Sequence, residues 1–319
     1  MDEVNEEIFT LIQSFLKNPP LIIWGSGATI PFGLPSMSDL NEALKAEIED
    51  FDNTNDNLEI ELGKEKYIEK MPEIKKTIWK MVNDSDVSVL NRIIANENAE
   101  FNGVKVLLEK FIDPHPQVIN IVTTNYDRVL EHIMSYHNFS FSDGFNGKVL
   151  STFDESQFRD QKNMNIIKVH GSLNWFEIDT EIRYMFGNIE DKSPQIIAPG
   201  ENKYKEAFSI PYRELIQKSD NLINGASSFF VVGFGFNDEH LTPKIKAKVN
   251  GGTPIVLITK EVTENTFSEL GNAQKYILLE EGEEGKTKIT YKKNQSSGQQ
   301  IINIDGDYWK LNKFMEILC

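Results

Sequence analysis

Polar residues that can do chemistry follow four apolar runs of the sequence, each at the point where the run ends. They are Gly25-Ser26-Gly27, Thr124-Asn125-Tyr126-Asp127, His170-Gly171 and Gly233-Phe234-Gly235-Phe236-Asn237-Asp238. A histidine can take up a proton near neutral pH, and amide or carboxylate groups can orient a hydroxyl group or a water molecule. Each group alone is more often a turn, a helix cap or a structural histidine. Together they favour one shared site, because the carboxyl ends of parallel strands meet at the same edge of a sheet.

The loop after the first apolar run has a composition suited to an anion. Glycine at positions 25 and 27 leaves no Cβ to block a ligand, and the N–H groups that follow are expected to point outward, where a phosphate is favoured. An ordinary glycine-rich turn is the alternative. The lysine of a P-loop is absent, and Gly33-Leu34-Pro35 interrupts the long helix of a dinucleotide fingerprint. We therefore expect a longer, irregular loop that can fold over its ligand.

Five apolar runs predict the strands of a parallel sheet, and the segments around them predict helices. We expect strands at residues 21–24, 117–122, 165–169, 228–232 and 255–259, and helices at 4–18, 38–49, 128–136, 212–224 and 307–318. This alternation is typical of a Rossmann-like α/β sheet with helices on both faces. Between these elements we expect short strands and loops (138–165), a connecting excursion with a hairpin around 181–186 (173–200), and a mobile loop or hairpin (281–300).

Residues 51–116 differ from the rest of the chain in composition and in the spacing of their apolar residues. They are rich in charge and in helix-forming residues, their apolar residues recur at helical spacing, and no run resembles a strand. This predicts a helical insertion within a single domain that spans residues 1–319. Because the insertion separates two of the polar loops, we expect it to lie at the mouth of the site. It is either a mobile lid or a rigid helical layer.

Composition excludes several classes of protein. The 319 residues are 39% hydrophobic, and they include no apolar run long enough to cross a membrane and no signal peptide, so a cytoplasmic location is expected. The single cysteine, Cys319, excludes a cysteine-based zinc site, and no metal is expected. A net charge of −16 makes direct binding of nucleic acid unexpected. We interpret the basic cluster Lys244, Lys246 and Lys248 as a solvated helix face.

In their order along the chain, these motifs resemble the sirtuin family. Gly25-Ser26-Gly27-Ala28-Thr29 with Gly33-Leu34-Pro35 is similar to the sirtuin loop Gly-Ala-Gly-x-Ser followed by Gly-Ile-Pro. Thr123-Thr124-Asn125-Tyr126-Asp127 is similar to Thr-Gln-Asn-Ile-Asp, and His170-Gly171 to the sirtuin His-Gly pair. The resemblance runs from about Leu21 to Thr259. It is strongest to the zinc-less bacterial branch of anti-phage defence, in which Thr-Thr-Asn-Tyr-Asp, His-Gly-Ser and Asn-Asp-Glu-His recur.

The resemblance implies an NAD site. It makes His170 the general base and places Asn125 and Asp127 at the nicotinamide ribose and carboxamide. It places Gly233, Gly235, Asn237 and Asp238 near the adenosine half. The remaining residues that it assigns to NAD binding are Gly25, Ser26, Gly27, Ala28, Thr29, Pro35 and Thr124.

Two departures from the family narrow the expected activity. The four zinc cysteines of deacetylase sirtuins are missing, and their Asp-Phe-Arg segment is replaced by Ser36-Met37-Ser38. The resemblance therefore implies an NAD⁺ glycohydrolase, in which water takes the ribosyl group and the products are nicotinamide and ADP-ribose. A non-catalytic module that binds NAD or ADP-ribose and a zinc-less protein deacylase are the alternatives.

A constitutive NADase would deplete its own cell, so gating is expected. The chain after residue 260 is too short to suggest a sensor domain. Assembly is then the expected gate, as a homo-oligomer or with a partner protein. The resemblance suggests a HerA-like ATPase or a short Argonaute as the partner, in an effector that acts by depleting NAD.

Overall fold

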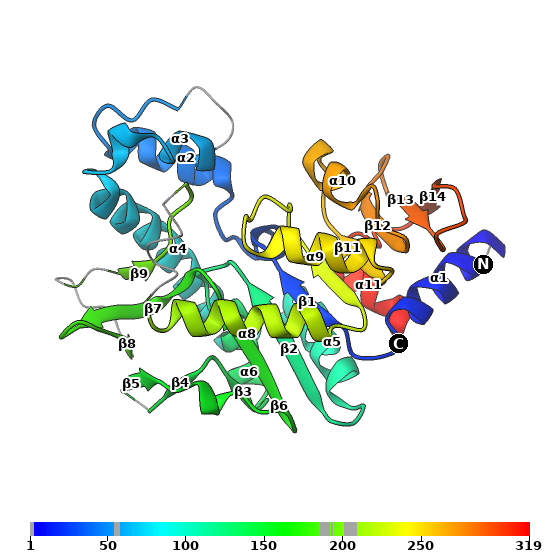
Figure 1. Ribbon diagram of the computed structural model, residues 1–319, viewed down its shortest axis with the longest axis horizontal. Helices are drawn as coiled ribbons and strands as arrows, with labels where there is room; N and C mark the ends of the chain where they lie inside the picture. Colours follow the sequence, from blue (N-terminus) through cyan, green and yellow to red (C-terminus); the bar gives the residue numbers. More distant parts are fainter. Residues whose placement is uncertain (1–2, 54–57, 148, 186–191, 193, 201–208) are drawn as a thin grey trace.

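The computed structural model describes residues 3–53, 58–147, 149–185, 192, 194–200 and 209–319. Within them the chain forms one large sheet, a smaller antiparallel sheet and the helices around them (Figure 1). The main sheet has the strand order β14-β13-β12-β11-β10-β1-β2-β6-β3. Its strands are β1 (Leu21–Trp24), β2 (Val118–Thr123), β3 (Phe141–Ser142), β6 (Asn163–Lys168), β10 (Phe229–Val232), β11 (Ile255–Ile258), β12 (Tyr276–Glu281), β13 (Lys286–Lys292) and β14 (Gln300–Asp305).

The strands from β3 to β12 pair in parallel, and β13 and β14 add an antiparallel edge. All five expected strands are present, with their ends within two residues of the expected bounds. The prediction of an α/β fold with a largely parallel sheet is therefore confirmed.

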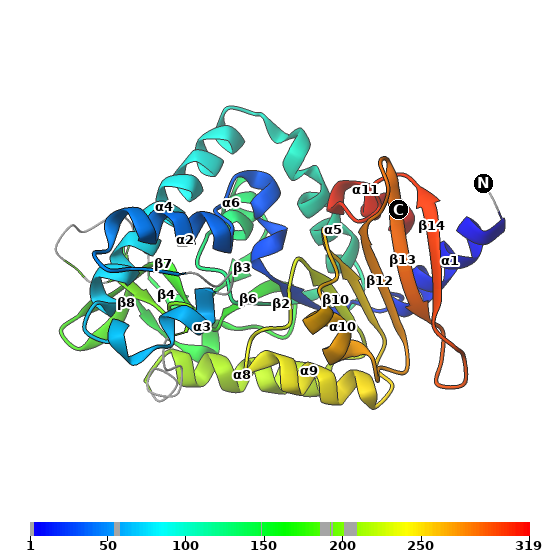
Figure 2. The same ribbon diagram turned by 90° about the horizontal axis from the view of Figure 1, so that it is seen from above.

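Side chains of the central strand β1 alternate between two hydrophobic cores. Leu21 and Ile23 face one core, and Ile22 and Trp24 face the other. Figure 2 shows that helices cover both faces of the sheet, as predicted. The first face carries α8 (Tyr212–Gly225), α9 (Leu241–Asn250) and α10 (Glu264–Leu270); the second carries α1 (Glu3–Phe15), α5 (Asn102–Ile112), α6 (Val129–Tyr136) and α11 (Leu311–Leu318).

The carboxyl ends of four strands are level with one another. Trp24 of β1 pairs in register with Val232 of β10 and with Thr123 of β2, and Thr123 pairs with Lys168 of β6. The order of strands reverses at β1, since β2 and β6 extend the sheet to one side and β10 to β12 to the other. In α/β sheets, ligands bind outside the strand ends at such a switch point.

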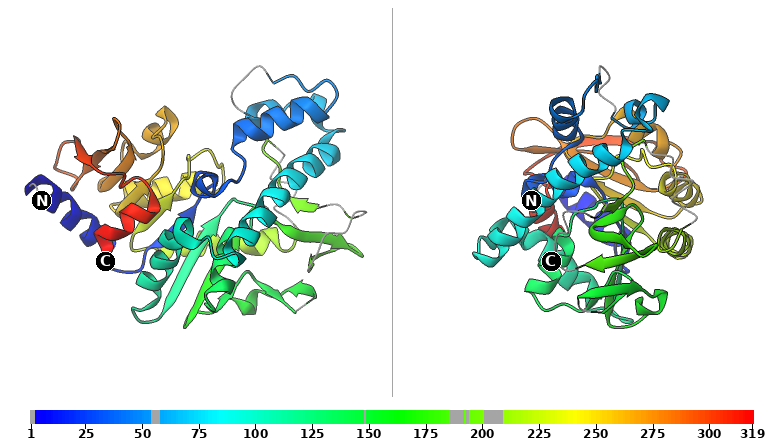
Figure 3. Two further views of the ribbon diagram at one scale, coloured as in Figure 1. Left: turned by 180° about the vertical axis from the view of Figure 1, so that it is seen from behind. Right: turned by 90° about the vertical axis from the view of Figure 1, so that its left-hand side faces the viewer.

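The described part of the segment 51–116 is helical, as predicted. It contains α3 (Leu58–Leu62), α4 (Met71–Ile94) and α5, together with the 3₁₀ turns Glu65–Tyr67 and Asn98–Phe101. α4 packs against α2 (Met37–Glu47) and α6, whereas α5 packs against β2 and α11. Figure 3 shows α2 and α3 beside α4, away from the main sheet. The segment 51–116 therefore has a projecting part, α3 and α4, and a part built into the core, α5.

Helix α2 begins earlier than expected. The helix starts at Met37, one residue before the expected residue 38, and Ser36 is its N-cap. The Ser36 hydroxyl accepts a hydrogen bond from the N–H of Asp39 at 3.2 Å, and the Asp39 carboxylate accepts one from the N–H of Ser36 at 2.8 Å. This reciprocal pair is a capping box, which fixes the start of the helix directly after Pro35.

The expectation of a mere connecting excursion over residues 173–200 was wrong. Its described part forms most of a second sheet of order β4-β5-β8-β7-β9, with strands β4 (Phe145–Asn146), β5 (Leu150–Phe153), β7 (Gly171–Ile178), β8 (Glu181–Met185) and β9 (Pro194–Ile196). The expected hairpin is present as β7–β8, with left-handed Asp179 and Thr180 at its turn; its expected last residue, Phe186, lies outside the described residues. Because β7 is buried on both faces over most of its length, it lacks the alternation that marks a surface strand.

Of the two alternatives for the polar stretch 281–300, the hairpin is confirmed. The stretch contains β13, which pairs antiparallel with β12 and β14. β13 carries lysines between buried threonine, isoleucine and tyrosine, so its composition left the loop open as an alternative. The last helix begins at Leu311, later than the expected residue 307.

Candidate active site

A cavity of about 440 Å³ lies at the aligned ends of β1, β2, β6 and β10, within the size range of small-molecule sites. All the residues predicted for the site line it except Gly25, Gly27 and Ala28. Those that line it are Ser26, Thr29, Pro35, Thr124, Asn125, Asp127, His170, Gly233, Gly235, Asn237 and Asp238. Four segments that are distant in the sequence thus converge on one space.

The glycines after β1 are needed for the packing of two loops, whereas the expected reason was access for a ligand. A Cβ on Gly25 would lie 2.3 Å from the carbonyl oxygen of Gly233, and a Cβ on Gly27 would lie 2.9 Å from the same atom. Gly233 itself has a φ of 59°, and its own Cβ would lie 2.1 Å from the nitrogen of Ala28. These glycines therefore let the loops after β1 and β10 pack against each other, and do not simply clear a path for a ligand.

The loop after β1 also offers fewer free N–H groups than a phosphate cradle would need. Residues Ser26–Ala28 form a 3₁₀ turn. The N–H of Gly27 donates to Gly233, that of Ala28 to Gly25, and that of Thr29 to Ser26. The expectation of several outward-pointing N–H groups was therefore wrong, because the turn and the neighbouring loop accept these hydrogen bonds.

Asn125 ties the loop after β2 to the loop after β1. Its amide nitrogen donates to the carbonyl of Gly25 at 3.0 Å and contacts the Thr29 hydroxyl at 3.3 Å. Its amide oxygen is buried at the cavity and has no hydrogen-bond partner among the described residues. A buried polar atom without a partner is uncommon and costly, so a ligand or water is the expected partner for this oxygen.

His170 follows β6 and lies at the cavity with 8% of its surface exposed. Its Nε2 is 2.9 Å from Oδ2 of Asp238, a contact without the alignment of a hydrogen bond, and Nε2 makes no hydrogen bond within the part of the chain that the structure describes. The other Asp238 oxygen accepts from the N–H groups of His240 and Leu241 at 3.0 and 2.8 Å, which fixes this carboxylate at the start of α9. Asp238 was expected near the adenosine half of NAD; its place beside His170 was not foreseen.

Asp127 is buried behind the cavity wall. Its two oxygens accept from the Thr29 hydroxyl and from the N–H of Val129, each at 3.2 Å. Burial raises the pKa of Asp127 to about 6, although the nearby Lys168 ammonium opposes this shift. Asp127 thus holds the loops together while carrying a charge that the protein interior disfavours.

The raised pKa of Asp127 makes Asp127→Asn an expected stabilising change at neutral pH. A carboxyl whose pKa is higher in the folded than in the unfolded chain destabilises the fold once it ionises, so wild-type stability falls as pH rises from about 4 through about 6. We expect the variant to gain on the order of 2 kcal/mol in urea unfolding at pH 7, and this gain to shrink towards pH 4. Exposed Asp160→Asn is the control; an equal gain in both variants, or a gain independent of pH, would contradict the assignment.

Lys168 is a buried cation that the sequence analysis did not single out. Its ammonium donates to the backbone carbonyl of Asp127 and lies 2.8 Å from the Glu131 carboxylate. A lysine in an otherwise apolar strand is the sequence signal that could have revealed it. Its bonds brace the Asn125–Asp127 loop from below.

An apolar wall that sequence reasoning missed closes the other side of the cavity. It is built from the turn before α2, from α2, α3 and α4, and from the segment after β9. Its residues are Leu34, Met37, Leu40, Leu58, Val82, Ile197, Ala198 and Pro199. The hydroxyl of Tyr126 donates to the carbonyl of Ile197 and links this wall to the Asn125 loop.

The interpretation of the basic cluster agrees with the structure. Lys244 and Lys246 form ion pairs with Asp220 and Glu269, and Lys248 donates to the carbonyl of Asn224. None of the helices in the described part of the chain is both long and apolar enough to span a bilayer. Nor do the described residues include three or more His, Cys, Asp or Glu side chains placed together to hold a metal ion.

Residues 119–253 match the family model of the SIR2-like domain. Solved structures that align with this chain include a Sir2 homologue in complex with NAD (14% identity, 86% of this chain and 87% of that chain, TM-score 0.49). They also include a mutant Sir2 homologue in complex with ADP-ribose (14% identity, 83% and 88%, TM-score 0.43). Comparison with curated protein sequences finds no match. The resemblance is thus confirmed at the level of a SIR2-like domain; the matched range contains Asn125, His170 and Asp238 but not the loop after β1.

Proposed function

We propose that this chain is an NAD⁺ glycohydrolase that releases nicotinamide and ADP-ribose. One observation carries the proposal. The amide oxygen of Asn125 is buried at the cavity without a hydrogen-bond partner among the described residues, and the imidazole of His170 lies at the same cavity beside Asp238. A hydrolase needs such an acceptor to orient a nucleophile and such a base to take its proton.

The proposed reaction breaks the bond between the nicotinamide nitrogen and C1′ of the ribose. The electron pair of that bond leaves with nicotinamide, which is cationic in NAD⁺ and neutral as product. Positive charge therefore develops on the ribose, as in glycoside hydrolysis. A water molecule oriented by the Asn125 oxygen bonds to C1′, and its proton passes to the imidazole of His170. Asp238 Oδ2, at 2.9 Å from Nε2, stabilises the imidazolium that forms.

The remaining lining groups fit the other parts of NAD. Ser26 supplies a hydroxyl for the pyrophosphate, with Thr29 and Pro35 lining the cavity beside it, and the loop of Gly233, Gly235 and Asn237 faces the adenosine half. Few N–H groups of the loop after β1 are free, and the Thr29 hydroxyl is used by Asp127 and Asn125, so we propose that the Ser26 side chain contributes more to phosphate binding than the backbone does.

Incubation of the purified chain with NAD⁺, followed by chromatography of nicotinamide and ADP-ribose, tests the activity. Equimolar formation of both products is expected. ADP-ribose binding without product release would point instead to a non-catalytic binding module. Nicotinamide release that requires an acylated lysine peptide would point to a zinc-less deacylase.

We further propose that the projecting part of segment 51–116 is a lid. Leu58, Glu59 and Val82 line the cavity from α3 and α4, whereas no residue of α5 does. Hydrogen exchange with and without ADP-ribose should therefore show added protection in residues 58–62 and around Val82, with α5 unchanged as an internal control. Equal exchange in α3 and α4 with and without ligand, alongside protection of residues 26–35, would make the segment a rigid layer.

The cellular role that we propose is a gated effector of anti-phage defence that acts by NAD depletion. It rests on the motif resemblance and on the need to keep such an activity silent. The gate would be assembly into a homo-oligomer or with a partner such as a HerA-like ATPase or a short Argonaute. Mass measurement during size-exclusion chromatography tests the gate, because a strict monomer with full activity contradicts it.

A further inference from the structure

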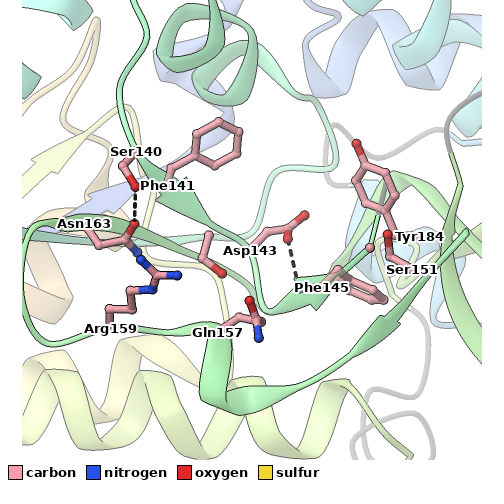
Figure 4. Close-up of a pocket in the computed structure, with 11 residues that line it drawn as sticks. Ser140, Phe141, Asp143, Phe145, Ser151, Gln157, Arg159, Asn163 and Tyr184 are labelled. Carbon is pink, nitrogen blue, oxygen red and sulfur yellow. Dashed lines mark hydrogen bonds between the residues drawn. The ribbon is translucent and has the colours of Figure 1, made fainter. Parts of the chain in front are cut away.

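A second cavity lies away from the first, at the outer edge of the main sheet where it meets the small sheet. It has a volume of about 250 Å³ and is lined from the β3–β4 region, the segment after β5, the start of β6, and Tyr184 of β8. Figure 4 shows Asp143 pointing into the space between Phe141 and Tyr184, and Arg159 beside Asn163 on the opposite side. None of these residues belongs to the site described above.

Neither charged residue of this cavity has an ion pair among the described residues. One Asp143 oxygen accepts from the N–H of Phe145 at 3.1 Å, but no cation pairs with the carboxylate among the described residues. The guanidinium of Arg159, an exposed residue, likewise has no ion pair or side-chain hydrogen bond to any described residue; its backbone N–H and carbonyl both bond to the Asn165 side chain. A carboxylate and a guanidinium thus face one cavity without neutralising each other.

The surroundings of Asp143 favour an organic cation. The rings of Phe141, Phe145 and Tyr184 line the same space, and aromatic faces beside a carboxylate are the usual recognition elements for an ammonium group. Burial raises the pKa of Asp143 to about 6, with Glu131 adding to the shift and Lys168 opposing it. A buried carboxylate of this kind gains more from a cationic partner than an exposed one does.

The surroundings of Arg159 favour an anion. A guanidinium presents a planar fork of N–H donors that matches a carboxylate. Beside it, the Ser140 hydroxyl donates to the Asn163 side-chain oxygen at 3.1 Å and so holds a polar wall in place, and Gln157 adds a further amide to the lining.

We propose that this second cavity binds a small zwitterion of the amino-acid or betaine class. Its ammonium group would lie among the three rings against Asp143, and its carboxylate would lie against Arg159. The proposal is independent of NAD⁺ cleavage, because it concerns binding at other residues.

Isothermal titration calorimetry on the full chain tests the proposal. The probes are glycine and glycine betaine as zwitterions, choline as the cation alone, and acetate as the anion alone. We expect a zwitterion to bind at least about tenfold more tightly than choline or acetate. Asp143→Asn and Arg159→Gln should each weaken it at least about tenfold, since each removes a charged hydrogen-bonding partner.

Matched controls are exposed Asp160→Asn and exposed Arg213→Gln, neither of which lines the cavity. Both should bind the zwitterion as wild type does. ADP-ribose titrated into every variant reports on the first cavity, and circular dichroism reports on folding. The proposal is overturned if no zwitterion binds, if choline or acetate binds as well as the zwitterions, or if folded Asp143→Asn retains wild-type affinity.

Discussion

His170→Ala is expected to lower the rate of nicotinamide release from NAD⁺ by at least roughly 10²-fold, the usual contribution of a positioned base. The side chain lies at the cavity, and its Nε2 makes no hydrogen bond to a described residue, only the 2.9 Å contact with Asp238, whose other oxygen keeps its two backbone N–H donors in the variant. The effect should therefore fall on turnover and leave the urea midpoint close to that of wild type. A continuous assay of nicotinamide release measures the first quantity, and urea unfolding measures the second.

The control for this experiment is His115→Ala, at an exposed histidine outside the cavity. It should hydrolyse NAD⁺ as wild type does. Asp238→Asn separates the role of the carboxylate from that of the ring, because it keeps the shape but removes the charge 2.9 Å from Nε2. We expect an intermediate loss of turnover and an altered pH profile. Wild-type turnover in His170→Ala would rule out the proposed mechanism.

Gly25→Ala is expected to destabilise the fold by about 3 kcal/mol or more, since the new methyl group has nowhere to go. It would lie 2.3 Å from the Gly233 carbonyl oxygen and 2.6 Å from the Cα of Phe234, and both atoms belong to the backbone. Gly233→Ala meets the same crowding from the other side. It also places an L-residue at a φ of 59°, which adds about 1–2 kcal/mol.

Gly235→Ala is the matched comparison. It lies in the same loop and lines the cavity, but its Cβ would meet only the side-chain nitrogen of Asn237, at an ordinary 3.5 Å. Its urea midpoint should correspond to a stability within about 1 kcal/mol of wild type. If Gly25→Ala were as stable as Gly235→Ala, the two loops could not be packed as described.

The sequence predicted the central part of the fold well, because buried parallel strands are continuous apolar runs and polar residues mark their ends. The position of His170, just beyond the end of β6, followed from that pattern alone. The sequence predicted less of the small sheet. β7 is buried on both faces over most of its length, so it lacks the alternation of apolar and polar residues that would have marked a surface strand. At β13 the sequence left a loop and a hairpin open, because its lysines give the strand a composition close to that of a loop.

For the candidate site, the sequence could name residue types but not their partners. Gly25 and Gly233 are about two hundred positions apart, so nothing local indicates that each makes room for the other. The approach of Asp238 to His170 depends on how α9 begins, and the apolar wall depends on how α3 and α4 fold back. Such contacts are set by tertiary packing, which residue spacing does not encode.

The central place of β1 limits how this chain can be divided. β1 lies between β2 and β10, yet it precedes both the helical segment and the range matched by the SIR2-like family. A fragment that began at β2 would keep Asn125, His170 and Asp238. It would, however, leave the edges of β2 and β10 unpaired on either side of a gap one strand wide, and unpaired strand edges promote aggregation. A separate peptide carrying residues 21–47 would fit that gap as a donor strand and restore the loop against Gly233. Splitting the chain before β2 would thus turn one protein into a two-part system that assembles only when both parts are present.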